Sequence, residues 1–235
     1  MSGGDLLLTT DKINGLLGIK ESYQASDTLH SILFNKEKRE KLFNAFLAVD
    51  WKLDKDWFHV YFEEEHANKL KYAQDFTPDS VSLLLSRLLG NKPGMRMDVA
   101  SGTGSLVIKK WNEDRLSHSP FTYKPSMYFY QCEELSDRAM PFLLFNLMIR
   151  GMNAIVMHGD VLSREAKQVY FIQNDRDDFM AFSSLNIMPH SKLVEQELDI
   201  RKWLESEIEY IESVAMPHHL KGVIDIGEKK GNPLL

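Results

Sequence analysis

The sequence predicts an α/β protein in which a parallel sheet follows a small helical module. After residue 94, short apolar runs alternate with helical stretches, the pattern of parallel strands joined by helices. Before it, apolar residues recur every three or four positions among lysines and glutamates, which indicates amphipathic helices. A length of 235 residues suits one large domain with a smaller appendage. We place the helical module at residues 1–72 and the larger domain at residues 73–235.

The helical module is expected to be helical from Ser26 to Ala73, with its apolar positions at Leu29, Ile32, Leu33, Leu42, Phe43, Phe46 and Leu47. Another helix is expected within "FTPDSVSLLLSRLLG", residues 76–90. Thr77 can cap this helix, Pro78 suits its first position and Gly90 can end it. The apolar face of this helix consists of Val81, Leu84, Leu85 and Leu88.

The larger domain alternates three expected strands with two expected helices. The strands are at residues 95–100, 127–134 and 154–160, and the helices at 105–116 and 138–151. Two further β-rich runs, 169–173 and 179–185, are separated by the charged turn "NDRDD". A long acidic amphipathic helix is expected from about Lys192 to Val214.

The composition limits the classes of protein to consider. A net charge of −6 argues against binding nucleic acid by bulk electrostatics alone, so a DNA contact is expected to be local or shared with a partner. No apolar run approaches a membrane-spanning length, and we expect no secretory signal. Cys132 is the only cysteine, which agrees with a cytoplasmic location. The eight histidines form no HExxH motif, and no metal is expected.

The segment "MDVASGTGSL", residues 97–106, has the form of a nucleotide-binding loop after a strand. A phosphate-binding P-loop requires GxxxxGK followed by Ser or Thr, which is missing here. A dinucleotide fingerprint requires a third glycine where Val107 stands. What remains is a loop in which Gly102 and Gly104 allow close approach to a ligand without phosphate-specific donors. Such a loop suits the amino-acid end of S-adenosylmethionine.

Acidic residues close the next two expected strands. Glu134 ends the second strand and Asp160 the third, and the carboxyl ends of parallel strands line one crevice. An acid on the second strand can accept hydrogen bonds from ribose hydroxyls, and one on the third can accept from the adenine amino group. The alternative is that the glycines form an ordinary turn, that Asp160 is a turn residue and that Glu134 caps the next helix.

Three segments of the sequence resemble the N6-adenine DNA methyltransferases, and among them the modification subunits of type I restriction systems. "AQDFTPDSVSLLLSRLL" resembles the segment before their first strand, "DVASGTGSL" resembles their D-P-A-C/S-G-T-G-G/S-L loop, and "CEELSDRAMPFLLFNLMIRGMNAIVMHGDVL" resembles the stretch that follows. The resemblance covers roughly residues 70–165. Its general form is also similar to methylase-like proteins of bacteriophages.

The resemblance implies a Rossmann-like class I S-adenosylmethionine-dependent methyltransferase fold with an N-terminal helical module. It implies that Phe76 and Thr77, with Pro78, pack over the methionine part of the cofactor, that Glu134 binds ribose and that Asp160 lies near adenine. The complete set of cofactor-binding residues that it implies is Phe76, Thr77, Asp98, Ser101, Gly102, Thr103, Gly104, Glu134, Leu135, Asp160 and Val161.

The chain departs from this family at the site that holds the target adenine. The family uses an [DN]PP[YF] motif there, and no such tetrapeptide occurs in this sequence. The candidates for the missing asparagine are Asn186, in "LNIMPH", and Asn174, in "QNDRD". Neither is followed by an aromatic residue at the stacking position, and this favours a turn asparagine in each case.

Two functions are therefore compared from the sequence. The first is an N6-adenine methyltransferase of restriction-modification type that relies on a partner or specificity subunit to reach DNA, because only 75 residues (161–235) follow Asp160. The second is a catalytically impaired relative that keeps the cofactor site and acts by protein association, as in phage modification or anti-restriction. An oligomer is compatible with both. A small-molecule or protein acceptor is a third possibility.

Overall fold

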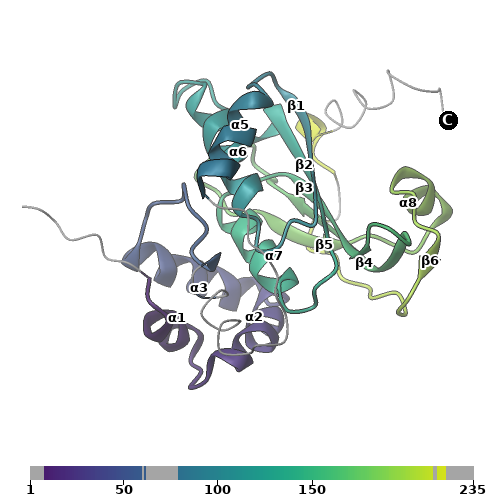
Figure 1. Cartoon of the computed structure of the whole chain (residues 1–235), viewed down its shortest axis with the longest axis horizontal. Coiled ribbons are helices and arrows are strands. Elements are labelled where there is room, and N and C mark those ends of the chain that lie inside the picture. The colour runs from purple at the N-terminus through teal and green to yellow at the C-terminus, as the bar shows by residue number, and fades with distance from the viewer. Residues whose placement is uncertain (1–7, 60, 62–78, 214–215, 221–235) are drawn as a thin grey trace, which may run out of the picture.

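The computed structural model describes residues 8–59, 61, 79–213 and 216–220 (Figure 1). The N-terminal module contains α1 (Thr10–Leu17), the short 3-10 helix η1 (Ser22–Gln24), α2 (Ala25–Leu33) and α3 (Lys36–Val49). Helical structure thus begins before Ser26, where the sequence pattern placed its start. Thr9 caps α1 by accepting from the Lys12 amide, and Asn35 caps α3.

The sheet has the order β1-β2-β3-β4-β5, and a short β6 pairs with β4. Its first three strands are parallel: β1 (Gly94–Val99), β2 (Tyr128–Glu134) and β3 (Ala154–Asp160). Beyond β3, the strands β4 (Glu165–Gln173) and β5 (Ser184–Ile187) run antiparallel to their neighbours, while β6 (Lys202–Trp203) is parallel to β4. The predicted α/β, Rossmann-like fold is confirmed.

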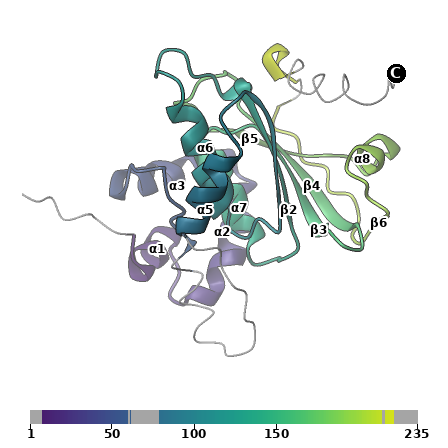
Figure 2. The same cartoon turned by 45° about the horizontal axis from the view of Figure 1, so that its top comes forward.

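Two helices connect the parallel strands at the expected places. They are α6 (Ser105–Leu116) and α7 (Met140–Ile149), and α5 (Asp79–Leu88) precedes β1. In Figure 2 these three helices lie together on one side of the strands, away from α8 and β6. All ten residues of α7 are buried, which fits a helix that is apolar on every side.

One hydrophobic core joins the N-terminal helices to the sheet through α7. Phe43 and Phe46 of α3 pack against Phe145 of α7 with ring centroids 4.8 and 4.9 Å apart. At the start of α7, the Ser26 hydroxyl donates to the Asp137 and Arg138 carbonyls. These contacts fix the helical module against α7, which packs on the sheet in the same core.

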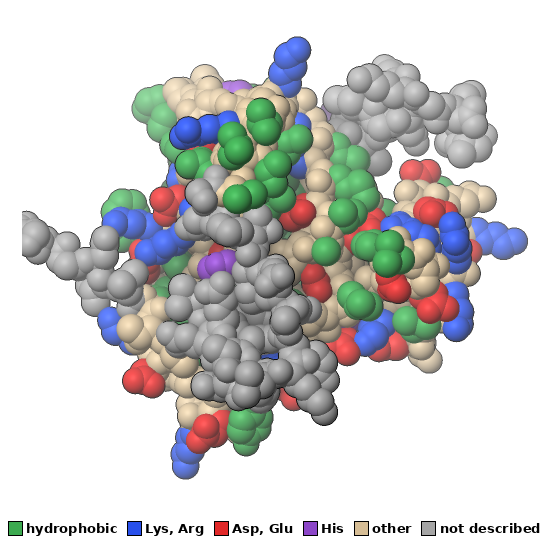
Figure 3. Space-filling view, in the orientation of Figure 1, with side chains coloured by type: hydrophobic (Ala, Val, Ile, Leu, Met, Phe, Trp, Pro, Cys, Tyr) green, Lys and Arg blue, Asp and Glu red, His purple; other side chains and the backbone are tan. Residues whose placement is uncertain are grey.

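The orientation of α5 differs from the expectation. Its apolar residues are exposed, with 42, 59, 40 and 73% of their surface accessible for Val81, Leu84, Leu85 and Leu88. The serines at positions 82 and 86 are buried instead, and α5 packs against α6. Small serine side chains allow two helices to approach closely. Hydrophobic side chains accordingly gather on the surface over α5 in Figure 3.

The predicted long C-terminal helix is wrong. Of the described residues in that range, 192–213, only α8 (Lys192–Glu197) is helical, and Asp199 then adopts a positive φ of 51°. The chain turns back so that β6 pairs with β4, and Trp203 stacks on His190 with ring centroids 3.7 Å apart. Pairing and stacking with distant residues therefore override the helical periodicity.

The bounds of β4 and β5 also differ from the expected ones. β4 begins at Glu165 instead of Val169, because its first residues pair with the end of β3 and with β6. β5 begins at Ser184 instead of Phe179, since the preceding residues form the turn that follows β4. Within the described part of the chain, no helix is long and apolar enough to cross a membrane.

A buried ion pair holds the segment after β6 against the N-terminal module. Both amino groups of Arg39 donate to the carboxylate of Glu212, at 2.6 and 2.7 Å, and the Arg39 side chain is 1% exposed. The Arg39 guanidinium and the Tyr210 hydroxyl hold the pKa of Glu212 below its usual value, against the effect of burial. The pair fixes the path of residues that the sequence predicted to be helical.

We predict that Glu212→Ala lowers the free energy of unfolding by about 3–5 kcal/mol, because it leaves the Arg39 cation buried without its partner. Chemical denaturation at pH 7 measures this value. Since the pKa of Glu212 is lowered by folding, the stability it contributes is present above its ordinary pKa and is lost as the pH falls through the folded value. A loss no larger than that of the exposed control Glu37→Ala would contradict the prediction.

Candidate functional site

The loop between β1 and α6 has an unusual backbone that brings it close to α7. Ala100, Gly102 and Gly104 all have positive φ values, of 62, 57 and 97°. A Cβ atom on Gly104 would lie 2.9 Å from the end of the Leu143 side chain, so a larger residue would require that side chain to move and would also be strained by the positive φ. Among the described residues, a Cβ atom on Gly102 would meet nothing within 4 Å. The loop therefore packs on α7 at Gly104 and is open to a ligand at Gly102.

The carboxylate of Asp56, from the N-terminal module, holds this loop in place. It accepts hydrogen bonds from the Thr103 and Ser105 hydroxyls, the second at 2.8 Å. It also accepts from the Asn146 amide of α7 at 2.8 Å, and the same amide donates to the Thr103 carbonyl at 2.8 Å. One carboxylate thus connects the N-terminal module, the glycine loop and α7.

Arg150 fixes the chain segment that carries Asp56. Its guanidinium donates to the Leu53 and Lys55 carbonyls at 2.9 and 2.7 Å and to the Asn146 side chain at 2.9 Å. Burial lowers the pKa of Arg150 to about 9, although the Asp56 carboxylate opposes this shift. Sequence analysis missed Asp56, Asn146 and Arg150. The signal for the last two was a pair of polar residues four positions apart in an otherwise apolar helix.

Two carboxylates stand at the open side of the glycine loop. Glu134, 6% exposed, accepts from the Gly102 amide at 2.6 Å and from the Ser136 amide at 2.7 Å. The Oδ2 atom of Asp98 is buried and has no hydrogen-bond partner among the described residues. Burial raises the pKa of Asp98 to about 6, and the nearby charge of Glu134 adds to the rise. An unpaired buried acid is costly unless a ligand supplies a donor or a cation.

The third predicted acid lies on the next strand at the same edge of the sheet. Asp160 ends β3, and the register places β3 beside β2, with Glu134 opposite His158. Its carboxylate accepts from the Leu162 amide at 2.8 Å, and this bond lowers the pKa of Asp160. Asp98, Glu134 and Asp160 therefore follow three neighbouring parallel strands.

The remaining predicted cofactor residues have different surroundings. Ser101 and Thr103 are buried within the loop, where the Ser101 hydroxyl donates to the Asp98 carbonyl at 2.9 Å. Leu135 is 58% exposed, and Val161 packs beside a small core near α8. Phe76 and Thr77, with Pro78, lie outside the described residues. Within the described ranges, no group of three acidic, histidine or cysteine side chains could hold a metal ion.

A model of the N-6 DNA methylase family matches residues 57–192, more than half of the chain. The chain belongs to the N-6 DNA methylase family. The matched range contains the glycine loop and the acids at the ends of β1, β2 and β3. A search of curated proteins gave no match.

The cofactor of this methylase family is normally S-adenosylmethionine, and the residues around the loop fit that molecule. Its amino-acid end carries an ammonium group, which would supply the donor that buried Asp98 lacks. Its ribose carries hydroxyls that a carboxylate such as Glu134 can accept from. Gly102, where the described residues leave open space, follows Asp98 in the loop and donates its amide to Glu134.

Asn174 and Asn186, the two candidates for the asparagine that holds the target adenine, both lie away from the glycine loop. β4 runs antiparallel to β3, so Asn174 lies at the amino end of β3, where its backbone amide donates to the side-chain oxygen of Asn153 at 2.7 Å. Asn174 is fully buried, and its side chain donates to the Gly151 and Asp178 carbonyls. These bonds are those of a turn asparagine.

Asn186 lies on β5, the last strand on the path from β1. Its register partner is Phe171, which pairs with Ile155 near the start of β3. The Asn186 side-chain oxygen accepts from the Glu212 and Ser213 amides, both at 2.9 Å. The fold thus brings neither asparagine to the edge where the three acids lie.

We predict that Asp98→Asn stabilises the protein at pH 7.5. Folding raises the pKa of Asp98 from about 4 to about 6, so the ionised form disfavours the fold, and stability falls as the pH rises across this interval. The amide removes this cost, which is at most about 3 kcal/mol for a shift of about two units. Thermal unfolding at pH 7.5 and pH 4 measures the gain and its loss in acid.

The matched control is Asp160→Asn. The pKa of Asp160 is lowered, not raised, so its replacement is expected to give no stabilisation at pH 7.5. Equal melting temperatures for Asp98→Asn and wild type at pH 7.5 would show that the Asp98 carboxylate is not destabilising.

Proposed function

We propose that this chain is an S-adenosylmethionine-dependent N6-adenine DNA methyltransferase of restriction-modification type that needs a partner for target recognition. The observation that carries the proposal is the open side of the glycine loop, at Gly102, beside the carboxylates of Asp98 and Glu134. In an N-6 DNA methylase this is the position expected for the amino-acid and ribose ends of the cofactor.

In this proposal, each acid binds a different part of the cofactor. Asp98 accepts from the ammonium group, Glu134 from the ribose hydroxyls and Asp160 from the adenine amino group. Leu135 and Val161 flank the ring, and Phe76 and Thr77 cover the methionine part. The Ser101, Gly102, Thr103 and Gly104 segment supplies backbone that approaches the ligand closely because two of its residues are glycines.

S-adenosylmethionine, when bound, supplies a methyl group that is already activated for transfer. The contribution of the protein is then to align this group with the acceptor and to exclude water. Asp56 acts here as a positioning residue, because it fixes Thr103 and Ser105 on either side of Gly104. Asn146 and Arg150 in turn fix Asp56 against α7.

The need for a partner rests on what the described sheet contains. In a doubly wound sheet the first strand has neighbours on both sides, and ligands bind where the strand order reverses. Here β1 pairs with β2 alone among the described strands. One face of β1, formed by Met95, Met97 and Val99, is 49 to 56% exposed. Together with the missing [DN]PP[YF] motif, this favours an acceptor site and a DNA-reading surface supplied by another chain.

A second function is favoured by the placement of Asn174 and Asn186 far from the glycine loop. In this alternative the protein binds the cofactor but transfers no methyl group, and it acts by associating with a modification system. The net charge of −6 agrees with a role in which DNA is contacted by the partner.

We predict that calorimetric titration detects S-adenosylmethionine binding and that Asp98→Asn and Glu134→Gln each weaken it at least about tenfold, the loss of one charge-assisted hydrogen bond. Because Asp98 must be ionised to bind an ammonium group, the affinity should be constant above pH 6 and fall about tenfold per unit below it. Leu162→Ala, at an 87% exposed position, is the control. Failure of wild type to bind would refute the cofactor site.

The two functions are separated by a methyl-transfer assay. With labelled S-adenosylmethionine and adenine-containing DNA, the first function predicts transfer when a restriction-modification specificity subunit is added and little without it. Asp98→Asn should lower that transfer when the cofactor concentration is below the wild-type Kd. Cofactor binding without transfer under every condition, together with stable association with the subunit, would establish the second function instead.

A further inference from the structure

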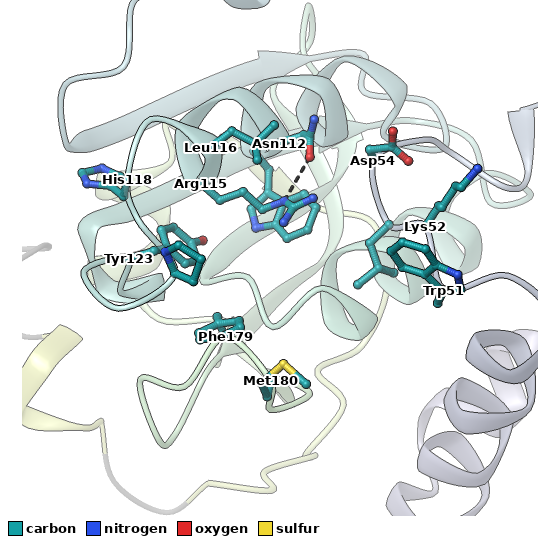
Figure 4. Close-up of a pocket in the computed structure, with 13 residues that line it drawn as sticks. Trp51, Lys52, Asp54, Asn112, Arg115, Leu116, His118, Tyr123, Phe179 and Met180 are labelled. Carbon is teal, nitrogen blue, oxygen red and sulfur yellow. Dashed lines mark hydrogen bonds between the residues drawn. The ribbon is translucent and has the colours of Figure 1, made fainter.

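A cavity lies beside the last turns of α6, at the other end of this helix from the glycine loop (Figure 4). It has a volume of about 530 Å³, within the range of small-molecule sites. α6 begins at Ser105 beside the glycine loop, and Arg115, which lines the cavity, follows ten residues later, about 15 Å along the helix. None of the residues assigned to the cofactor lines this cavity. It is therefore distinct from the proposed cofactor site.

The cavity is lined by aromatic side chains from four separate segments. Trp111 and Tyr123 are buried, at 4 and 8% exposure, and form its inner surface. Trp51 and Phe179 line it as well but are 76 and 45% exposed. Contiguous apolar surface around a groove marks interaction and ligand-binding sites more often than scattered exposed residues do. They offer flat faces on which a planar ring can stack.

Positive charge accompanies these rings. The Arg115 guanidinium lies over the Trp111 ring, 4.8 Å from its centroid, and its Nε donates to Asn112 at 3.0 Å. Its two amino groups make no hydrogen bond within the described residues. Lys52 also lines the cavity, and Asp54 is its one acid, so the lining carries a net charge of +1 in a protein whose net charge is −6.

We propose that this cavity binds a nucleotide, with its base stacked on Trp51 and Phe179 and its phosphate on Arg115 and Lys52. Aromatic faces next to cationic side chains are the combination by which proteins hold unpaired bases. An apolar peptide side chain would gain from the rings but nothing from the two cations. The nucleotide could belong to a single DNA strand or be free. The proposal does not depend on the cofactor site.

The test is fluorescence anisotropy of the full chain with a labelled thymidylate single strand of about 12 nucleotides, a length within the range that such proteins cover. Wild type is expected to bind it, and Trp51→Ala and Phe179→Ala should each weaken binding about tenfold or more, as expected for the loss of base stacking. The control is Tyr23→Ala, an aromatic residue 62% exposed in the N-terminal module, which should leave binding unchanged.

Two further measurements identify the source of the nucleotide and the role of charge. If free thymidine monophosphate displaces the labelled strand at the same nucleotide concentration as an unlabelled strand does, the cavity is a site for free nucleotides. If only the unlabelled strand displaces it, the ligand is single-stranded DNA. Arg115→Gln should reduce the slope of log affinity against log salt by about 1. Because Trp51 and Phe179 are exposed, their variants should melt as wild type does.

The proposal is overturned if wild type binds neither strand nor nucleotide, or if Trp51→Ala and Phe179→Ala bind as tightly as Tyr23→Ala. Titration of the same samples with S-adenosylmethionine tests the cofactor site separately from the cavity. If wild type binds the strand but not S-adenosylmethionine, the cofactor site fails and the nucleotide cavity stands. If it binds S-adenosylmethionine but no strand or nucleotide, the nucleotide proposal fails and the cofactor site stands.

Discussion

The geometry of the glycine loop depends on the Asp56 carboxylate. This group lies outside the sheet, in the segment after α3, yet it accepts hydrogen bonds from Thr103, Ser105 and Asn146. The positive φ value of Ala100 would be costly in an isolated loop, and it persists because side chains on both flanks fix the backbone. The N-terminal helices are consequently part of the site as well as part of the core.

Stability and binding are opposed at the open side of this loop. The Oδ2 atom of Asp98 is buried without a hydrogen-bond partner among the described residues, and Glu134 adds a second negative charge beside it. A pocket with these properties is unfavourable when empty of positive charge and becomes favourable when an ammonium group arrives. Such local destabilisation is typical of binding sites and is offset here by the aromatic core around α7.

The sequence predicted the parts of the fold that local pattern determines. The bounds of α6 and β3 match the expected ranges. Contacts between distant residues decided the rest. The segment after α8 is extended because Glu212 pairs with Arg39 and Trp203 stacks on His190. Likewise, Asp56 was not identified because its partner Asn146 lies 90 residues away, and no sequence motif joins them.

The central claim is that the glycine loop and its two carboxylates hold S-adenosylmethionine. A crystal structure of the full chain grown with the cofactor tests it most directly. The account predicts the amino-acid end of the cofactor beside Gly102 with its ammonium group within hydrogen-bond distance of Asp98, and the ribose hydroxyls on Glu134. Density for the cofactor in any other position, such as the cavity at Trp51 and Arg115, or well-occupied density at the loop with neither carboxylate in contact, would contradict it.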